Sequence, residues 1–298
     1  MLKQQILGIL NLSLPFVVLY LVSPVFIISV WGRLLCSLFL GLYVYYLNSK
    51  QAQNLTASLK FSPSGASKEV WEQELQHCQI PEGMVTLRYA YTTENIAMTV
   101  NQTVIMDPVL WSSVQEDSEA QKVQDVFRNF IESGLSERQK TRLAEIQAAL
   151  TEPAQRFIFR HEVGHVVRQF SRNKLGLIFV SGVLFSFTGL SMAVALIPFN
   201  GFLAAFAGMF VGGVMDMMLT YAINYFFKLK EEREADLFAI HFSTSEEIEA
   251  AATFFEKHQE ILNTHGEKSF LTSYLPSTVL TGYPDGKQRA AWLRRCNR

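Results

Sequence analysis

Two long stretches of the chain are apolar and almost free of charge. Residues 4–49 contain Arg33 as their single charged side chain, and residues 175–227 contain Asp216 as theirs. About 20 apolar residues cross a hydrocarbon core of roughly 30 Å, so each window is long enough for two membrane-spanning helices. The pattern therefore predicts four transmembrane helices, arranged as two hairpins.

Turn signals divide each apolar window. In the second window, the turn residues at 198–201 leave spans near 176–197 and 202–227. In the first window, a serine followed by a proline at residues 23–24 marks a helix start, and the Trp-Gly-Arg sequence at residues 31–33 is an alternative turn. The apolar stretch is too long for the core of a cleavable signal peptide, so we expect a hairpin in either case.

Basic residues at the ends of the windows predict how the chain crosses the membrane. If each window is a hairpin, all of its flanking basic residues face one side, and Arg33 alone faces the other. These flanking residues are Lys3, Lys50, Lys60, Arg168, Arg172, Lys174, Lys228, Lys230 and Arg233. By the positive-inside rule, both termini and the polar remainder lie in the cytoplasm. We therefore expect a multi-pass protein of the cell (inner) membrane, in contact with the lipid bilayer.

Outside the two windows, the composition is that of a soluble domain. The 26 Lys and Arg residues nearly balance the 27 Asp and Glu residues, and the net charge is −1. This balance provides no basic face for nucleic acid, which we exclude as a partner. The three cysteines, Cys36, Cys78 and Cys296, form no CxxC pair, which argues against a disulfide framework and a thiolate metal site and agrees with a reducing compartment.

The polar segment between the windows contains a metal-binding motif. A helix start at residues 151–153 combines a threonine cap, an acidic first turn and a proline. The helix that follows carries His161 and His165 four residues apart, so both imidazoles project from one face and can hold one Zn²⁺. Glu162 lies about 100° round the helix, where its carboxylate can reach a metal-bound water. A chance HExxH match in this chain is on the order of one in a hundred.

A carboxylate after the second window can complete the ligand set. The segment KEEREADLFA, residues 230–239, places Glu232 and Asp236 on one helical face. One of them can bind the metal while the other accepts a hydrogen bond from the far nitrogen of a ligand histidine. Alone, the segment is typical of a solvated helix end, but the HEVGH motif favours the ligand role.

HEVGH, the window at 175–227 and EREAD follow one another in the order and spacing typical of one family. In these motifs the chain resembles the HtpX and CAAX-prenyl-protease family of membrane zinc peptidases, HExxH enzymes with a glutamate as third ligand. The HtpX branch also has an N-terminal hairpin and a similar length. The resemblance implies an α+β, mainly helical fold, in which a zincin-like metallopeptidase domain accompanies the membrane helices.

The resemblance also assigns the site and its single Zn²⁺ per chain. The metal ligands that it implies are His161, His165 and Glu232. Asp236 is then the residue behind a ligand histidine, which the spacing supports because Glu232 lies one turn before it. Glu162 is implied as the general base. The neighbouring residues Glu231 and Glu234 are alternatives for the third ligand.

A weaker similarity concerns substrate binding. Residues 95–98 (NIAM) and 103–110 resemble the family's NAFA element, strand and following leucine turn. We expect an edge strand at 95–106, to which an extended peptide can add through main-chain hydrogen bonds with little sequence selectivity. The substrate-binding residues are then Asn95, Ala97 and Met98. The alternative is an ordinary hairpin with its turn near residues 101–102.

Two further segments set limits to the resemblance. Residues 282–289 resemble the family's C-terminal HP…R segment, with Tyr283 in place of the usual histidine. Tyr283 and Arg289 are the candidates for a second electrophile beside the metal. Residues 111–150 show helical periodicity and have no clear counterpart in the HtpX branch. They form either an insert that gates substrates or regulates the enzyme, or additional helices that only add to the packing of the domain.

The sequence thus predicts four segments. Residues 1–49 form an N-terminal transmembrane hairpin, and residues 175–227 form a second one. Residues 50–174 are the first part of the metallopeptidase domain, with the HEVGH helix at 152–171. Residues 228–298 are its second part, with the EREAD helix and the C-terminal segment.

These features predict a membrane-bound zinc metalloendopeptidase that hydrolyses peptide bonds with zinc-activated water and Glu162 as general base. Glu232 follows the second window by five residues and His165 precedes it by ten. Continuous helices would therefore place the metal within roughly 10 to 15 Å of the bilayer edge. We expect protein substrates that are membrane proteins or membrane-proximal segments, including misfolded proteins. The oligomeric state is left open.

Two other functions compete with this one. An intramembrane site-2-type protease also uses HExxH, but there the motif lies inside a span, whereas charged residues surround this one. These residues are Arg156, Arg160, Glu162, Arg168 and Arg172. The second alternative is a non-catalytic membrane scaffold or transporter centred on Asp216, because a carboxylate within a span is costly and often functional.

Overall fold

The structure is a computed structural model that divides into two compact units. The described residues are 29–90, 96–111, 117–168, 170–196, 210, 214, 227–265 and 285–297. The first unit comprises Met1–Gln51 and Asn173–Ile223, and the second comprises Ala52–Arg172 and Asn224–Arg298. Each unit is therefore built from two separate parts of the sequence.

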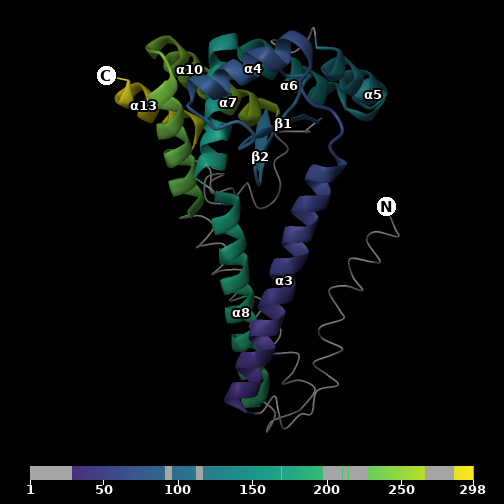
Figure 1. Cartoon of the computed structure of the whole chain (residues 1–298), viewed down its shortest axis with the longest axis vertical. Coiled ribbons are helices and arrows are strands. Elements are labelled where there is room, and N and C mark those ends of the chain that lie inside the picture. Colours follow the sequence, from purple (N-terminus) through teal and green to yellow (C-terminus); the bar gives the residue numbers. More distant parts are fainter. Residues whose placement is uncertain are drawn as a thin grey trace. The chain divides into compact units, whose positions relative to one another are not determined.

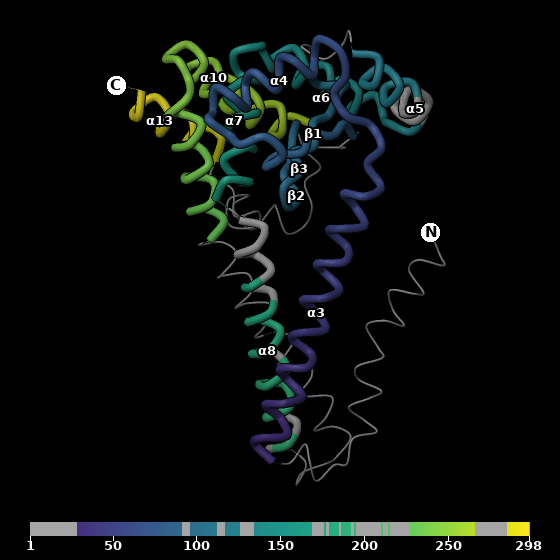
Figure 2. The backbone as a smooth tube through the Cα atoms, in the orientation of Figure 1, coloured from purple at the N-terminus to yellow at the C-terminus, as the bar shows by residue number. Residues whose placement is uncertain are grey.

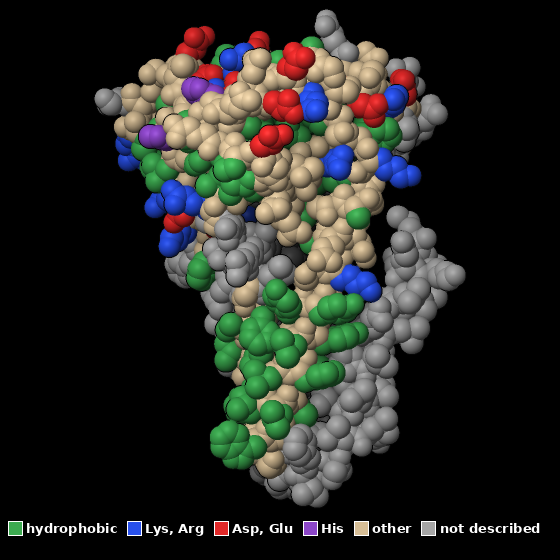
Figure 3. All heavy atoms as spheres, in the orientation of Figure 1, with side chains coloured by type: hydrophobic (Ala, Val, Ile, Leu, Met, Phe, Trp, Pro, Cys, Tyr) green, Lys and Arg blue, Asp and Glu red, His purple; other side chains and the backbone are tan. Residues whose placement is uncertain are grey.

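The first unit contains a helix that can cross a membrane. Helix α3, Val30–Ser58, is the one helix among the described residues that is long and apolar enough to do so. Its start is capped by Ser29, whose hydroxyl oxygen accepts a hydrogen bond from the Gly32 N–H at 2.9 Å. Helix α3 exposes large apolar side chains such as Trp31 and Leu42. Figure 3 shows hydrophobic side chains gathered over the helices of the first unit.

Helix α8, Phe170–Leu196, packs against α3 within the first unit. The two helices cross where Gly41 of α3 meets Gly182 and Val183 of α8. A Cβ atom added to Gly41 would overlap Val183 and lie 3.1 Å from the carbonyl oxygen of Phe179. Small residues at the crossing allow this close approach, as in packed membrane helices.

The structure corrects one of the predicted turns in this region. Helix α3 continues past the apolar window to Ser58, because the residues after Lys50 are polar and still compatible with a helix. The first unit itself ends at Gln51, two residues from the predicted end of the hairpin at residue 49. Residues 31–33 form the first turn of α3, after the Ser29 cap, so a turn between two spans does not lie there. The alternative turn at 23–24 lies outside the described residues, and so does the turn at 198–201.

The predicted set of four transmembrane helices is therefore supported only in part. In addition to α3, the structure contains a shorter apolar stretch of α8, Phe179–Ser191. Asp216 lies outside the described residues, and the residues predicted for the span at 202–227 are described only at 210, 214 and 227. The broader prediction of a mainly helical α+β fold is confirmed.

The second unit has helices packed around a small sheet (Figure 1). Its elements before the metal motif are α4 (Gly65–His77), β1 (Thr86–Tyr89), β2 (Ala97–Val100), β3 (Thr103–Met106), α5 (Ser118–Gly134) and α6 (Glu137–Ala149). The later elements are α7 (Glu152–Val167), a helix over residues 227–242, α10 (Ser245–His265) and α13 (Gly286–Cys296). Helices α5 and α6 fill the segment without a clear HtpX counterpart, and α10 and α13 lie side by side (Figure 2).

The sheet has the strand order β1-β3-β2, with β3 parallel to β1 and antiparallel to β2. The stretch predicted as one edge strand at 95–106 is therefore a hairpin, the alternative that the sequence left open. Its two-residue turn is Asn101-Gln102, and Asn101 adopts a positive φ of 56°. Asparagine tolerates this left-handed conformation better than most residues, which explains the reversal there. Among the described strands, β2 is left at one edge of the sheet.

Helix α7 runs through the core of the second unit. One of its faces packs Phe159 and Val163 into the main apolar cluster, where Phe159 lies against Trp71 of α4 with ring centroids 4.6 Å apart. Another face packs Phe157 against α10 and α13. The helix ends at Val167, before the predicted end at 171, and the N–H of the C-cap residue Arg168 makes the last bond of the helical pattern, to the carbonyl of Gly164.

A buried ion-pair cluster fixes α7 between two other helices. The guanidinium of Arg160 donates to Glu74 of α4 at 2.8 Å and to Glu247 of α10 at 2.6 Å. Burial alone would lower the pKa of Arg160, but its two carboxylate partners raise it. Each charge of the cluster is thus paired and hydrogen-bonded, which is the condition for burying charges at moderate cost. Loss of one partner would leave an uncompensated buried charge beside the site.

Candidate metal centre and active site

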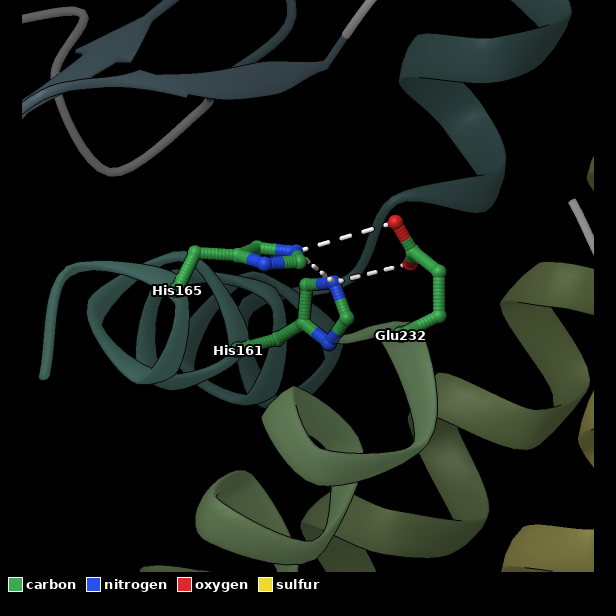
Figure 4. A group of neighbouring side chains, drawn as sticks. All are labelled: His161, His165 and Glu232. Carbon is green, nitrogen blue, oxygen red and sulfur yellow. Dashed lines mark hydrogen bonds and ion pairs between the residues drawn. The ribbon is translucent and has the colours of Figure 1, made fainter. Parts of the chain in front are cut away.

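Two imidazoles from one face of α7 meet at the candidate site. Thr151 and Pro153 begin this helix as the sequence predicts, and the helical repeat then brings His161 and His165 over one another. Their Nε2 atoms are 3.1 Å apart, and their rings are nearly perpendicular (Figure 4). Both side chains are largely enclosed by protein, and their Nε2 atoms face a common point.

The third group comes from the helix over residues 227–242. One carboxylate oxygen of Glu232 lies 3.2 Å from Nε2 of His161, and the other lies 3.7 Å from Nε2 of His165 (Figure 4). Among the described residues, these three form the one group of His, Cys, Asp and Glu side chains that could hold a metal ion. Glu231 and Glu234, the alternatives, are half-buried and lie outside this group.

The distances between the three groups fit a tetrahedral metal ion. Bonds of about 2.0–2.2 Å at tetrahedral angles separate two ligand atoms by about 3.3–3.6 Å. Here the two Nε2 atoms are 3.1 Å apart and lie 3.2 and 3.7 Å from the two different oxygens of Glu232. With one ligand atom taken from each residue, all three atoms lie within 4.8 Å of one another. Two imidazoles and one carboxylate are also the donor set of open, catalytic zinc sites. The residues present therefore fit a divalent ion such as zinc with a fourth position free for another ligand.

A close helix crossing brings the third ligand into place. Gly164, inside HEVGH, faces Ala235 on the helix over residues 227–242, and a Cβ atom at Gly164 would lie 3.1 Å from the Cα of Ala235. The same Cβ would lie 3.1 Å from the Cβ of Phe238. Small residues on both helices thus allow their backbones to approach, and the approach carries Glu232 to the two histidines.

Asp236 lies behind the first imidazole. Its carboxylate is 2.8 Å from Nδ1 of His161, the nitrogen that faces away from Glu232 and His165. This contact orients the ring and favours a proton on Nδ1, which leaves the lone pair of Nε2 for a metal. Nη2 of Arg289 also lies 3.0 Å from Nδ1 and 3.3 Å from Nε2 of the same ring. Arg289 of α13 in turn donates to Asp236 from Nε at 3.0 Å and from Nη2 at 2.5 Å.

Arg289 itself is held by the C-terminal helices. Its guanidinium lies over the ring of Phe255 in α10, 3.9 Å from the centroid. It also lies 3.8 Å from the carboxylate of Glu232, so it balances the charge of both acidic groups. The structure therefore brings this predicted electrophile next to the ligand group, where it bonds to Asp236. Tyr283, the other predicted electrophile, lies outside the described residues.

The surrounding charges set the pKa values of the two imidazoles far apart. Burial lowers the pKa of His161, but the carboxylates of Asp236 and Glu232 outweigh it and raise the pKa to about 9. Burial, together with the charge on His161, lowers the pKa of His165 to about 3. The carboxylates therefore favour one positive charge at this point, whether a proton or a metal ion supplies it. His165 keeps a neutral ring with a free lone pair, as a metal ligand must.

Glu162 lies beside the ligand group with its carboxylate almost fully buried. Burial raises the pKa of this carboxyl above its usual range, whereas the charge on His161 and a hydrogen bond from Thr99 oppose the rise. The hydroxyl of Thr99 in β2 lies 2.7 Å from Oε2 of Glu162. A carboxylate with a raised pKa is a better proton acceptor at neutral pH, which suits a general base.

The predicted substrate-binding residues are partly described. Ala97 and Met98 lie on β2, the strand that carries Thr99 and packs against α7. Asn95 lies outside the described residues. Three residues of the site region were not predicted from the sequence: Thr99, Gly164 and Ala235. The small side chains of Gly164 and Ala235, inside the two motifs, were an available signal of a close crossing, whereas Thr99 follows NIAM without any distinguishing pattern.

A helix with two histidines and a buried glutamate in the HExxH spacing, joined by a carboxylate from a later helix, is the arrangement typical of the HExxH metallopeptidases. The sequence model of peptidase family M48 matches residues 99–279, well over half of the chain. The chain therefore belongs to peptidase family M48, and the resemblance to the HtpX and CAAX-prenyl-protease peptidases is confirmed. Comparisons with curated proteins and with solved structures give no match.

Proposed function

We propose that this M48 metallopeptidase is a membrane-bound zinc endopeptidase with one Zn²⁺ per chain. The observation that carries the proposal is the group of His161, His165 and Glu232, whose mutual distances suit a tetrahedral ion. When bound there, zinc supplies a Lewis acid that polarises a scissile carbonyl and acidifies water. The two imidazole nitrogens of the donor set support zinc over the hard ions Mg²⁺ and Ca²⁺, which prefer oxygen ligands.

The other steps of the proposed reaction are assigned to side chains of the protein. Glu162 accepts the proton of the attacking water and passes it to the leaving amine. Asp236 keeps Nε2 of His161 directed at the ion, and Arg289 holds Asp236 in place through two hydrogen bonds. The second electrophile for the developing oxyanion remains a proposal, with Tyr283 and Arg289 as candidates.

Substrates of this enzyme are extended segments of membrane or membrane-proximal proteins, including misfolded ones. Support comes from the edge strand β2, which lies next to Glu162 and can pair with an extended chain. Further support comes from the sequence distance to the first unit, because His165 precedes the boundary at Asn173 by eight residues and Glu232 follows the boundary at Asn224 by eight. We propose that the catalytic unit lies in the cytoplasm and is connected through the chain to a multi-pass membrane anchor.

The competing functions fit the chain less well. In a site-2-type protease the HExxH helix is itself a membrane span, whereas α7 is enclosed by the sheet, α4 and α10 and forms buried ion pairs through Arg160. A scaffold or transporter centred on Asp216 would not require a ligand group beside a buried glutamate. Membership of a peptidase family also favours catalysis over that role.

The decisive experiment compares the purified full chain with Glu162→Gln and with a matched control, Glu152→Gln, an exposed glutamate of the same helix. We expect about one zinc per chain in all three proteins. Cleavage of an unfolded protein in detergent should fall by about 10²- to 10⁴-fold in Glu162→Gln, as for the loss of a general base, and should be unchanged in Glu152→Gln. A chelator should abolish cleavage by the wild type.

Two results would contradict the proposal. One is a folded wild-type protein that binds no zinc and cleaves nothing. The other is a Glu162→Gln protein that cleaves at the wild-type rate. A map of the cut sites adds a separate test, because cuts within the apolar spans of substrates would favour a site-2-type protease.

A further inference from the structure

The hydroxyl of Thr99 makes two contacts with Glu162. It lies 2.7 Å from the carboxylate oxygen Oε2 and 3.0 Å from the backbone carbonyl oxygen of the same residue. A hydroxyl has one proton to donate, and the shorter contact is to the charged acceptor, which forms the stronger hydrogen bond. Thr99 therefore fixes one oxygen of the carboxylate and leaves the other, Oε1, free to face the reacting water.

The backbone of the same residue faces the open edge of the sheet. In an antiparallel pair, residues that exchange hydrogen bonds with the partner strand alternate with residues that do not. The Asp107 N–H donates a hydrogen bond to the carbonyl of Ile96, so Ile96 and Asp107 are a hydrogen-bonded pair. Counting in steps of two along β2 from Ile96, the next residues that bond to β3 are Met98 and Val100. Ala97 and Thr99 then direct their N–H and C=O groups away from β3, where no strand among the described residues pairs with them.

Thr99 thus has its backbone at the open edge of the sheet and its hydroxyl on the proposed catalytic base, Glu162. We propose that Thr99 is a positioning residue: its backbone pairs with an extended substrate, while its hydroxyl holds the Glu162 carboxylate in the orientation that accepts the water's proton. The substrate class that this arrangement takes is an unfolded segment with free main-chain N–H and C=O groups. The inference rests on the proposed peptidase function and adds to it a residue outside the HEVGH and EREAD motifs.

Four variants of the full-length protein separate the hydroxyl from the shape of the side chain. Thr99→Val keeps the branched shape and removes the hydroxyl, and Thr99→Ser keeps the hydroxyl and removes a methyl group. Thr99→Ala removes both, so the Ser and Ala variants differ by the hydroxyl alone. The control is Thr103→Val, a buried threonine on the neighbouring strand β3.

We expect kcat for a peptide substrate to fall by about tenfold to a hundredfold in Thr99→Val and Thr99→Ala, the range for losing one hydrogen bond to a charged group. KM and zinc content should change little, because the metal ligands and the substrate-facing backbone are retained. Thr99→Ser should recover kcat to within about threefold of the wild type. Thr103→Val should keep the wild-type kcat.

The edge pairing has its own readout. A substrate peptide that carries N-methyl groups at alternate amides cannot donate those hydrogen bonds, so its KM should rise by about tenfold or more, whereas Thr99→Val acts on kcat.

Equal kcat in the Ser and Ala variants would overturn the role of the hydroxyl. Only one of the two sets of alternate amides faces β2, so a KM that stays unchanged with both N-methylated sets, tested separately, would overturn the pairing. A wild-type chain without zinc or cleavage would refute the peptidase function instead.

Discussion

Asp236 connects the ligand group to the C-terminal helix of the chain. Its carboxylate contacts Nδ1 of His161 on one side and the guanidinium of Arg289 on the other. Burial alone would raise the pKa of Asp236, but Arg289 and His161 hold it at about 2, so the side chain stays ionised at all ordinary pH values. A permanent negative charge behind the ring makes His161 a stronger ligand.

Replacement of Asp236 by asparagine should weaken metal binding. The amide keeps the size of the side chain but removes the charge that orients and polarises the imidazole of His161. We expect zinc affinity to fall by about tenfold to a hundredfold, as is typical for partners of ligand histidines. Competition titration with a chromophoric chelator measures this. Glu234→Gln, on the same helix and outside the ligand group, is the control, and equal affinities of Asp236→Asn and the wild type would refute the expectation.

At the scale of residues, the sequence predicts those contacts that follow from the spacing of residues along one helix. The spacing of four residues is enough to predict that His161 and His165 share a helix face, and the structure places them so. The contact of Thr99 with Glu162 joins residues far apart in the chain and depends on how the hairpin packs on α7. No local sequence pattern encodes that packing, so the role of Thr99 could not be predicted from the sequence.

At the scale of elements, Asp117 ties three segments of the second unit together. It caps α5 by accepting the Glu119 N–H, and it accepts hydrogen bonds from the backbone and hydroxyl of Ser64, which precedes α4. The phenol of Tyr89, at the end of β1, donates to the same carboxylate at 3.0 Å. Burial alone would raise the pKa of Asp117, but these donors hold it below its usual range.

Asp117→Asn should therefore destabilise the second unit in a pH-dependent way. A folded-state pKa below the unfolded value stabilises the protein above the unfolded pKa, about 3.9, and this stabilisation disappears as the pH falls through the folded pKa. We expect a loss of about 1–3 kcal/mol at pH 7 and a smaller difference from the wild type below about pH 4. Thermal unfolding in detergent across this pH range measures both.

Glu69→Gln, at an exposed position on α4, provides the comparison for that experiment. It changes the same formal charge without removing a buried hydrogen-bond acceptor, so it should leave the melting temperature nearly unchanged at pH 7. A loss of stability in Asp117→Asn that is equally large at pH 3 and pH 7 would show that the charge of Asp117 contributes nothing.

The hairpin formed by β2 and β3 has a turn that the sequence alone does not establish. Residues 95–106 were predicted as one strand, with a hairpin turning near 101–102 as the alternative, because Asn101-Gln102 is not one of the dipeptides, such as Asn-Gly, that are typical of a tight turn. The reversal depends on the positive φ of Asn101 and on the pairing of β3 with β1, a contact between distant segments. By contrast, the start of α7 at residues 151–153 is encoded locally by its cap and proline, and the structure begins the helix there.

At the scale of the whole molecule, the candidate metal site joins the two parts of the second unit. His161 and His165 belong to Ala52–Arg172, whereas Glu232 belongs to Asn224–Arg298. A bound ion would act as a cross-link between these parts in addition to the apolar packing of α7 against α10. Since the ion binds the folded site and not the dispersed ligands, it stabilises the folded unit.

Removal of the metal should therefore lower the melting temperature. Free zinc at 100 times its dissociation constant stabilises the folded state by about 2.7 kcal/mol, which corresponds to roughly 5–10 °C for a domain of about 200 residues. Calorimetry or fluorescence in detergent, with and without a chelator, measures the shift, and added zinc should reverse it. His161→Ala should already melt low and respond to neither reagent. A chelated wild type that melts at the original temperature would contradict the cross-linking role.

The discontinuity of the second unit also imposes an order on biosynthesis. Glu232 is translated 67 residues after His165, which takes on the order of 3 to 13 seconds at about 5–20 residues per second. Throughout that interval the nascent chain carries the HEVGH helix without the carboxylate that completes the ligand group. The residues translated in between include the apolar window of the first unit, so a chain that stalls before or within that window cannot complete the site. Peptidase activity is thereby withheld until the ribosome has passed the apolar window and reached residue 232.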